Sequence, residues 1–230
     1  MIRKYLNFSS RLRTAYKNLK KSYKEVKDSY AEMIFRMALV AELKDDTTGT
    51  HLVRIADYST ELAAGLGLAH KTIELIKYAS PMHDIGKLVI TDNILKKPGK
   101  LTSEERMIME KHTIFGADIF EGSKAELLIM AQDICITHHE KYDGSGYPYK
   151  KKGEEISLAG RIVAVADVFD ALTNARPYKN SIDFDVAVDM LSEESGKHFD
   201  PKVIAAFMKN IPKIRKIWQA TKDIDSFVNT

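Results

Sequence analysis

The sequence predicts an all-α fold, and three observations support this prediction. Hydrophobic residues recur at helical spacing along most of the 230 residues. No run shows the sustained period-two alternation of a strand, and Gly and Pro concentrate in two loops, at 96–100 and 143–155. Because 44% of the residues are hydrophobic, the chain has ample material for a buried core.

The amino-terminal region predicts one long helix over residues 8–44, with no Gly or Pro between residues 1 and 48. Residues 1–27 hold nine Lys or Arg and a single acid, Glu25. The helix also carries apolar or aromatic residues at alternating intervals of four and three, a heptad seam: Leu12, Tyr16, Leu19, Tyr23, Val26, Tyr30, Met33 and Met37. We expect this helix to pair with a second copy of the chain in parallel. The alternative is that the stripe packs on the protein's own core.

The rest of the chain is expected to form a second unit, residues 45–230, after the helical unit of residues 1–44. Helices are predicted over 48–65, ending at two glycines, and over 71–80. Thr102 and Glu105 have the spacing of a capping box that opens a helix toward His112. Further helices are predicted over 113–121, 125–139, 158–173, 183–195 and 200–209.

Composition excludes several classes of protein. The net charge of +3 is too balanced to indicate DNA binding. The single cysteine, Cys135, lies in an apolar run, so neither a disulfide framework nor a thiolate metal site is expected. No run is long and apolar enough for a membrane span, and no signal-peptide core is present. We expect a cytoplasmic protein, or the cytoplasmic part of a membrane-associated sensor.

Five of the seven histidines lie beside acids or at expected helix ends: His51, His83, His112, His138 and His139. Asp84 follows His83 directly, and Asp167 lies in a later predicted helix. Imidazole and carboxylate are suitable ligands for iron, manganese or zinc, and a carboxylate such as Asp84 can bridge two ions. Two such ions can bind a phosphodiester and activate water. Each of these residues, taken alone, has a purely structural interpretation, such as a hydrogen-bonded surface pair or a core histidine.

The adjacent histidines raise a separate question, because neighbouring residues on a helix point about 100° apart. We expect His138 and His139 to reach two different ions from one corner of the chain. His70 and His198 are expected at a helix start and in a turn, without a role in metal binding.

Five segments carry a family resemblance: MHDIGKL at 82–88, KPGKLTSEE at 97–105, HTIFGADI at 112–119, HHEKYDGSGYP at 138–148 and RIVAVADVFDALTNARPYK at 161–179. Together, in this order, they resemble the HD-GYP family of the HD hydrolase superfamily, over about residues 35–210. The resemblance implies an HD-domain helical bundle, a centre of two or three metal ions, usually iron or manganese, and hydrolysis of cyclic di-GMP to the linear dinucleotide pGpG or on to GMP.

The resemblance also implies roles for individual residues. The metal ligands would be the following seven: His51, His83, Asp84, His112, His138, His139 and Asp167. Asp84 would be the catalytic bridge, and Lys87 would contact an oxygen of the scissile phosphate, although a solvated surface lysine is the alternative. Substrate contacts would come from Lys87, Tyr147, Asp170, Arg176 and Lys179, with Tyr147 stacking on a guanine and Asp170 steadying either the site or a base.

One departure from the family pattern concerns the number of ions. Members with three metals carry Glu four residues before the first histidine, whereas this chain has Thr47 in that place. A neutral hydroxyl is a poor substitute for a carboxylate, so we expect two divalent ions, iron first and manganese second, and doubt a third. The linear dinucleotide should then accumulate.

Three functions stay open on sequence alone. The first is a cyclic di-GMP phosphodiesterase that an upstream sensor regulates through the amino-terminal helix. The second is a signalling module that binds a cyclic dinucleotide, or a partner such as a diguanylate cyclase, without hydrolysis. The third is a hydrolase of a hybrid cyclic dinucleotide. The complete ligand set, Lys87 and the Gly-Tyr-Pro segment favour an enzyme.

Overall fold

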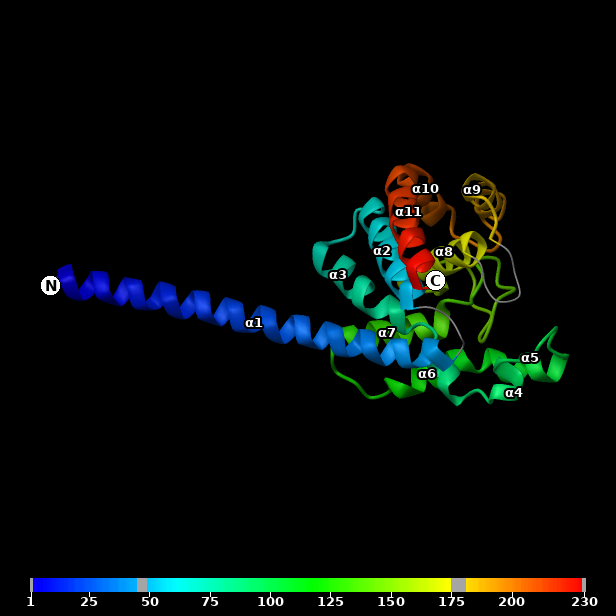
Figure 1. Ribbon diagram of the computed structural model, residues 1–230, viewed down its shortest axis with the longest axis horizontal. Helices are drawn as coiled ribbons and strands as arrows, with labels where there is room; N and C mark the ends of the chain where they lie inside the picture. The colour runs from blue at the N-terminus through cyan, green and yellow to red at the C-terminus, as the bar shows by residue number, and fades with distance from the viewer. Residues whose placement is uncertain (1, 45–48, 175–180, 229–230) are drawn as a thin grey trace.

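A computed structural model describes residues 2–44, 49–174 and 181–228 of the chain. Within those ranges it contains helices and no strand, and the sole ladder contact is an isolated bridge between Ser195 and Phe199. The predicted all-α fold is therefore confirmed. Figure 1 shows one long helix that extends far from a cluster of shorter helices.

The elements follow the predicted order closely. They are α1 (Ile2–Lys44), α2 (Gly49–Gly65), α3 (His70–Ala79), η1 (Ser80–Met82), η2 (Ile85–Val89), α4 (Asp92–Leu95), α5 (Ser103–Glu110), α6 (His112–Ile119), α7 (Glu126–Thr137), η3 (Gly153–Glu155), α8 (Leu158–Thr173), α9 (Phe184–Glu193), α10 (Pro201–Lys209) and α11 (Ile211–Val228), where η marks a 3-10 helix. The capping box is present: Thr102 Oγ1 accepts from the Glu105 amide at 3.3 Å, and Glu105 Oε2 accepts from the Thr102 amide at 2.8 Å.

The terminal helix α11 was missed by the sequence reasoning, which ended its last helix at residue 209. Ile214 is fully buried, and Trp218 packs against the core, with its ring 5.2 Å from that of Phe184. The helix carries these residues four apart, a helical interval. The apolar spacing of residues 211–218 was therefore the signal that could have found it.

The core of the globular part centres on α2 and α8. Phe169 of α8 is fully buried, and its ring meets those of Tyr58, Phe184 and Phe207 at centroid distances of 5.4, 5.3 and 5.1 Å, all steeply inclined. Edge-to-face pairs of this kind stabilise a core beyond the apolar area they bury. Their packing fixes the two helices that carry His51 and Asp167.

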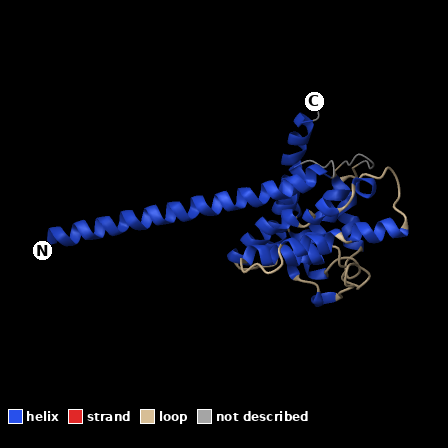
Figure 2. Ribbon diagram, turned by 90° about the horizontal axis from the view of Figure 1, so that it is seen from below, coloured by secondary structure: helices blue, strands red, loops and turns tan. Residues whose placement is uncertain are grey.

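The long helix α1 has two different faces. The eight residues of the predicted seam are all exposed, from 45% for Met37 to 71% for Tyr23, and Val40 continues the spacing at 58%. Near the end of α1, by contrast, Ile34, Ala38 and Ala41 are buried against the globular part. The alternative that the seam packs on the protein's own core is therefore wrong. Figure 2 shows the amino-terminal half of α1 standing clear of the other helices.

No helix of the described chain combines the length and the apolar character needed to cross a membrane.

Candidate metal centre

The His83–Asp84 pair sits at a sharp change of direction between two short 3-10 helices. Pro81 stands in the first turn of η1, where its missing amide hydrogen costs nothing, and the His83 amide donates to Ser80 O at 3.2 Å. The Lys87 amide then donates to Asp84 O at 2.9 Å and opens η2. This corner turns both side chains toward the ends of α6 and α7.

All seven predicted ligands lie within the described chain, and they converge in two groups. In each group, the ligand atoms lie within 4.8 Å of one another. The first group combines Asp84 with residues at the start of α6 and the end of α7: Asp84, His112, His138 and His139. The second combines residues of α2, the corner and α8: His51, His83 and Asp167.

Asp84 lies between the two groups. Its Oδ1 is 3.2 Å from His112 Nε2 and 3.6 Å from His138 Nε2, whereas its Oδ2 is 3.2 Å from His83 Nε2. One carboxylate therefore faces both groups with different oxygens, as a bridging ligand must. Asp167 Oδ1 completes the second group at 3.9 Å from both His51 Nε2 and His83 Nε2.

Four of the histidines are held by their Nδ1 atoms. His83 Nδ1 lies 3.0 Å from Ser80 O, His112 Nδ1 lies 2.8 Å from Met109 O, and His138 Nδ1 lies 3.0 Å from Cys135 O. The Nδ1 of His51 lies 2.7 Å from a carboxylate oxygen of Asp170. A proton on Nδ1 that donates to such an acceptor leaves the Nε2 lone pair free to bind a metal.

The centre contains four buried polar atoms that lie close to one another but make no hydrogen bond within the described chain. They are His83 Nε2, Asp84 Oδ1, His112 Nε2 and His138 Nε2, and all four belong to the two groups. Unsatisfied buried polar atoms are rare in native proteins and need an explanation. Nitrogen and oxygen donors that converge without thiolates suit iron, manganese or zinc, so these residues fit a centre of divalent metal ions.

The pKa shifts agree with a metal centre. Burial alone would raise the pKa of Asp84, but the Lys87 ammonium, 2.8 Å away, and His83 outweigh it and hold the pKa well below its usual range. Burial lowers the pKa of His138, and burial together with neighbouring histidines lowers that of His139 strongly. Burial alone would also lower the pKa of His83, but Asp84 and Asp167 outweigh it and raise the pKa to about 9. The carboxylates therefore favour a cation here, whether proton or metal.

The adjacent histidines do not behave as predicted. His138 caps the end of α7 in helical conformation, and its ring lies 4.0 Å from that of His139 at an interplanar angle of 42°. Both belong to the same group, together with Asp84 and His112. The geometry thus favours one ion for both histidines, in place of the two different ions that were expected.

Asp170 has buried partners on the protein itself. It is 2% exposed; Oδ1 accepts from Arg54 Nε at 2.5 Å, and Oδ2 lies 2.7 Å from His51 Nδ1. Asn174 Nδ2 also donates to Oδ1 at 3.0 Å. Of the two expected roles, the structure therefore supports steadying the site, and it gives Asp170 no exposed edge for a substrate base. Hydrogen bonds to His51 and Arg54 outweigh burial and lower the pKa of Asp170.

Arg54, which sequence reasoning did not identify, forms this support together with Asp170. Arg54 is 3% exposed and lies one turn after His51 on α2, while Asp170 lies one turn after Asp167 on α8. Two ligands of the second group, His51 and Asp167, thus each have a supporting residue on their own helix. The spacing of three residues after each ligand was the available signal.

Replacing Asp170 by asparagine is expected to weaken metal binding at the second group by about 10- to 100-fold, as loss of a carboxylate behind a ligating histidine does. The buried Arg54 guanidinium would also lose its countercharge. Iron titration of the apoprotein measures the effect. Asp133→Asn is the control, since this acid is on α7 but belongs to neither group. Equal affinity in both variants would refute the supporting role.

The loop after α7 is tied to the centre through Glu140. This residue is 2% exposed and accepts the amides of Tyr149 at 2.7 Å and of Lys151 at 3.1 Å. Burial raises its pKa in spite of these bonds. Tyr147 consequently lies beside the first group, with its ring 4.8 Å from that of His139, and burial raises the pKa of its hydroxyl.

Gly146 allows the loop to approach the chain so closely. A Cβ there would lie 2.3 Å from the Lys141 amide nitrogen and 2.6 Å from His139 O, both of which are backbone atoms. Gly144 has φ +87° and so adopts a turn conformation that suits glycine. The loop is held on the metal side of α7 by both features.

The remaining predicted residues are placed as follows. Lys87 is in η2, 15% exposed at its side chain and in contact with Asp84. Arg176 and Lys179, the expected phosphate and guanine contacts, lie outside the described residues, and so does Thr47. His70 begins α3 and His198 lies in a turn, as expected, and neither belongs to the two metal groups.

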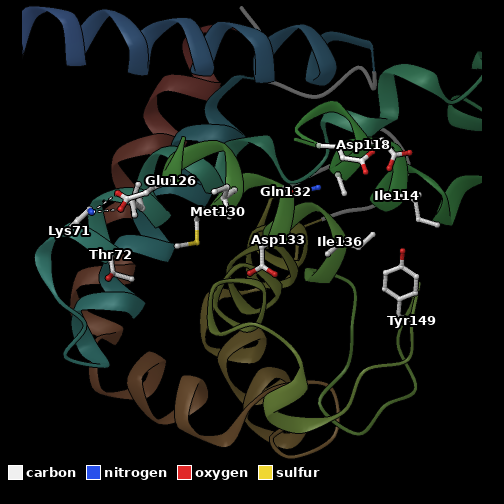
Figure 3. A pocket seen from close by; sticks show the side chains of 14 residues that line it. Lys71, Thr72, Ile114, Asp118, Glu126, Met130, Gln132, Asp133, Ile136 and Tyr149 are labelled. Carbon is white, nitrogen blue, oxygen red and sulfur yellow. Dashed lines mark hydrogen bonds and ion pairs between the residues drawn. The ribbon is translucent and has the colours of Figure 1, made fainter. Parts of the chain in front are cut away.

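A large surface cavity lies away from the centre. Its volume is about 760 Å³, and it is lined by α3, α6 and α7 residues and by Tyr149. Figure 3 shows Asp118, Gln132 and Asp133 among the polar side chains that line it, with Lys71 paired to Glu126 at one end. None of its lining residues belongs to the two metal groups. The cavity is therefore separate from the metal centre.

Comparison with known proteins agrees with this geometry. A family model described as HD domain matches residues 34–203, so the chain belongs to the HD domain family. Within that family it belongs to the HD-GYP type, to which the five segments and its curated relatives point. The predicted resemblance is confirmed.

The relatives span longer proteins. The chain is 43% identical over 179 residues to 3'3'-cGAMP-specific phosphodiesterase 2 of Vibrio cholerae, covering 78% of this chain and 34% of that protein. It is 40% identical over 186 residues to the cyclic di-GMP phosphodiesterase response regulator RpfG of Xanthomonas campestris, covering 81% and 49%. A cyclic di-GMP phosphodiesterase of Thermotoga maritima is 40% identical over 198 residues, covering 86% and 54%. The chain thus spans about half the length, or less, of these relatives.

Solved structures support the fold. A cyclic GMP-AMP specific phosphodiesterase of V. cholerae, V-cGAP3, superposes with a TM-score of 0.62 over 86% of this chain and 53% of that chain, at 19% identity. Bd1817 of Bdellovibrio bacteriovorus superposes with a TM-score of 0.58 over 84% and 64%, at 20% identity. At these identities, the likeness speaks for the helical fold alone.

Proposed function

We propose that this chain is a metal-dependent phosphodiesterase that hydrolyses cyclic di-GMP to linear pGpG. The observation that carries the proposal is the pair of ligand groups that Asp84 faces with its two oxygens, together with four buried nitrogen and oxygen atoms that lack hydrogen-bond partners in the described chain. Two divalent ions bound there would supply the positive charge that binds a phosphodiester, activates water and stabilises the leaving oxygen. Iron is the first candidate and manganese the second.

The protein's own side chains have separate tasks. Lys87 places an ammonium beside Asp84, where it can offset negative charge on a phosphate oxygen. Tyr147 presents a ring next to His139, at the position where a guanine could stack. Arg176 and Lys179 would bind the substrate phosphates or guanines, a role that here rests on the family resemblance.

Substrate choice separates the two enzyme candidates. The curated relatives include phosphodiesterases for cyclic di-GMP and others named for 3'3'-cGAMP, so the hybrid dinucleotide is the second candidate. The test is anaerobic purification followed by chromatography of products from each cyclic dinucleotide. Faster cleavage of cyclic di-GMP, as a ratio of kcat/KM, supports the proposal, and faster cleavage of the hybrid selects the second candidate. Tight binding without any product indicates a binding module.

The extent of cleavage depends on the third metal position. With Thr47 in place of a carboxylate, we expect about two metals per chain, and we expect pGpG to accumulate while GMP forms slowly. Thr47→Glu should raise the metal content and the yield of GMP. Elemental analysis and a product time course measure both. Three tightly held metals in the wild type, or GMP without a linear intermediate, would contradict this prediction.

The amino-terminal helix supports a further proposal, a parallel homodimer. The nine exposed positions from Leu12 to Val40 follow heptad spacing, and burying an apolar side chain contributes about 1.5 kcal/mol or more. Such a dimer would connect the catalytic unit to an upstream sensor, or bring it near a diguanylate cyclase. We also propose that the protein lies in the cytoplasm.

Two substitutions in the seam test the dimer. Leu19→Glu with Val26→Glu should convert a dimer at micromolar concentration to a monomer, because four charged side chains would meet at one interface. Sedimentation equilibrium measures the mass. Asn18→Glu, a change at an exposed position off the seam, should leave the dimer intact. A wild-type monomer, or a dimer that survives the double substitution, would contradict the seam.

A further inference from the structure

The end of α1 lies against the segment that carries the catalytic residues. Helix α1 contacts both η1 and η2, the two 3-10 helices that flank His83 and Asp84. Figure 1 shows this end of α1 at the cluster of shorter helices, while the other end extends away from it. The buried face of α1, with Ile34, Ala38 and Ala41, holds this end in place. The long helix therefore reaches the segment that carries His83 and Asp84.

Lys44, the last residue of α1, makes the polar part of that contact. Its Nζ donates to Leu88 O at 2.8 Å and to Ile90 O at 2.6 Å. Asp92 Oδ1 lies 3.8 Å away on a side chain that is 69% exposed. The last carbonyls of a helix lack partners within it, and a positive charge at that end is favourable. Lys44 thus binds the end of η2 from a different helix.

The position of helix η2 depends on contacts with other helices, such as the one that Lys44 makes. It has five residues, and short 3-10 helices have poorer hydrogen-bond geometry than α-helices. On its other side, Gly86 lies so close to α6 that a Cβ would be 1.9 Å from His112 O. Lys87, between the two contacts, directs its Nζ to Asp84 Oδ2 at 2.8 Å, and its carbonyl accepts from the Ile90 amide at 3.1 Å.

We propose that Lys44 is a positioning residue that couples α1 to Lys87. By holding the carbonyls of Leu88 and Ile90, it sets where the Lys87 ammonium stands relative to Asp84, so a displacement of α1 alters the reaction without changing a ligand. The role of Lys87 in the reaction rests on the proposed function. The coupling itself is a property of the fold and has its own readouts.

The test uses Lys44→Met, which keeps the stem and removes the donor, with bis(p-nitrophenyl) phosphate as a diester that carries no base. We expect kcat to fall on the order of 10- to 100-fold, as misplacement of one group by about 1 Å does. Metal content should stay at the wild-type value. Lys44→Arg should restore most of kcat, because it retains a cationic donor.

Lys27→Met is the matched control, since Lys27 is another α1 lysine with a partner on the globular part, Glu74 of α3. That pair is far along α1 from η2, and partly exposed pairs contribute little. We expect kcat to change by less than about 2-fold. A loss as large as that of Lys44→Met would show that any weakening of α1 has the same effect, and it would overturn the specific role of Lys44.

A double-mutant cycle separates positioning from general stability. If Lys44 acts through Lys87, then Lys44→Met should cost less than about 3-fold in a Lys87→Met background. If Lys44→Met lowers kcat by the same factor in the wild type and in Lys87→Met, the proposal is overturned. Loss of metal or an unchanged kcat in Lys44→Met alone would also overturn it. Hydrogen exchange at the Ile90 amide should also be faster in Lys44→Met than in Lys27→Met. Unchanged exchange there would contradict the coupling even if the protein proved inactive on every diester.

The results expected for the Lys44 variants can be told apart from a failure of the proposed cyclic di-GMP hydrolysis. A wild-type protein that cleaves the synthetic diester but neither cyclic dinucleotide would reject the proposed substrate. It would leave the kinetic cycle for Lys44 fully readable.

Discussion

Replacing Asp84 by alanine is expected to reduce hydrolysis by at least about 1,000-fold, because charge stabilisation by metal ions supplies several kcal/mol. Asp84 presents Oδ1 to His112 and His138 and Oδ2 to His83. Its loss removes the carboxylate that faces both groups and the countercharge of Lys87. The helices should persist, since Asp84 is not among the residues of the hydrophobic core.

Two measurements check the prediction for Asp84. Turnover of cyclic di-GMP should fall to the background rate, and elemental analysis should show loss of bound metal. Asp84→Asn serves as the isosteric control, because it keeps the size of the side chain and removes its charge. It should lose metal as well, which attributes the effect to the carboxylate. An Asp84→Ala protein with full metal content and wild-type turnover would refute the assignment.

Replacing Gly86 by alanine is expected to disrupt the centre without touching a ligand. The new Cβ would lie 1.9 Å from His112 O and 2.4 Å from the Gly116 amide nitrogen, and neither backbone atom can rotate away. Helix α6 would have to move, and His112 would move with it. We expect unfolding to become easier by about 3 kcal/mol or more.

Denaturant unfolding of the apoprotein measures this cost, and metal analysis measures the loss of the first group. Gly67→Ala is the control: it has φ +74° and no atom within 4 Å of a new Cβ. It should cost about 1–2 kcal/mol from backbone strain alone. If the Gly86 variant is no less stable than the Gly67 variant and keeps its metals, the tight packing of η2 on α6 is incorrect.

Much of the fold could be predicted because helical periodicity and capping residues act locally. The capping box at Thr102 and Glu105 is an example, since it depends on residues within one turn. Helix α11 depends instead on how Ile214 and Trp218 pack on distant helices. Its periodicity was present in the sequence and Pro212 stands in its first turn, but no Gly or Pro follows to mark its end.

The candidate site followed from residue types and family resemblance, but its supports did not. Histidines and Asp84 are conspicuous in a sequence, and the structure brings all seven proposed ligands together. Arg54, Glu140 and Lys44 look like ordinary charged residues until the fold places them against Asp170, the loop of Tyr147 and the end of η2. Their partners are distant in sequence or reached through the backbone, so local spacing carries little information about them.

The grouping of His138 and His139 was likewise not predictable from local spacing in the sequence. Helical geometry separates neighbouring side chains by about 100°, and that argument applies only while the helix continues. Here α7 ends at Thr137, and the Glu140 amide donates to Thr137 O as the chain turns. Both rings then face Asp84 and His112, which a helical projection could not reveal.

The most direct test of the metal centre is anomalous diffraction at the iron edge from crystals of the anaerobically purified protein. Two peaks per chain are expected, one beside Asp84, His112, His138 and His139 and the other beside His51, His83 and Asp167, with Asp84 between them. A single peak, or peaks that do not contact Asp84, would contradict the account.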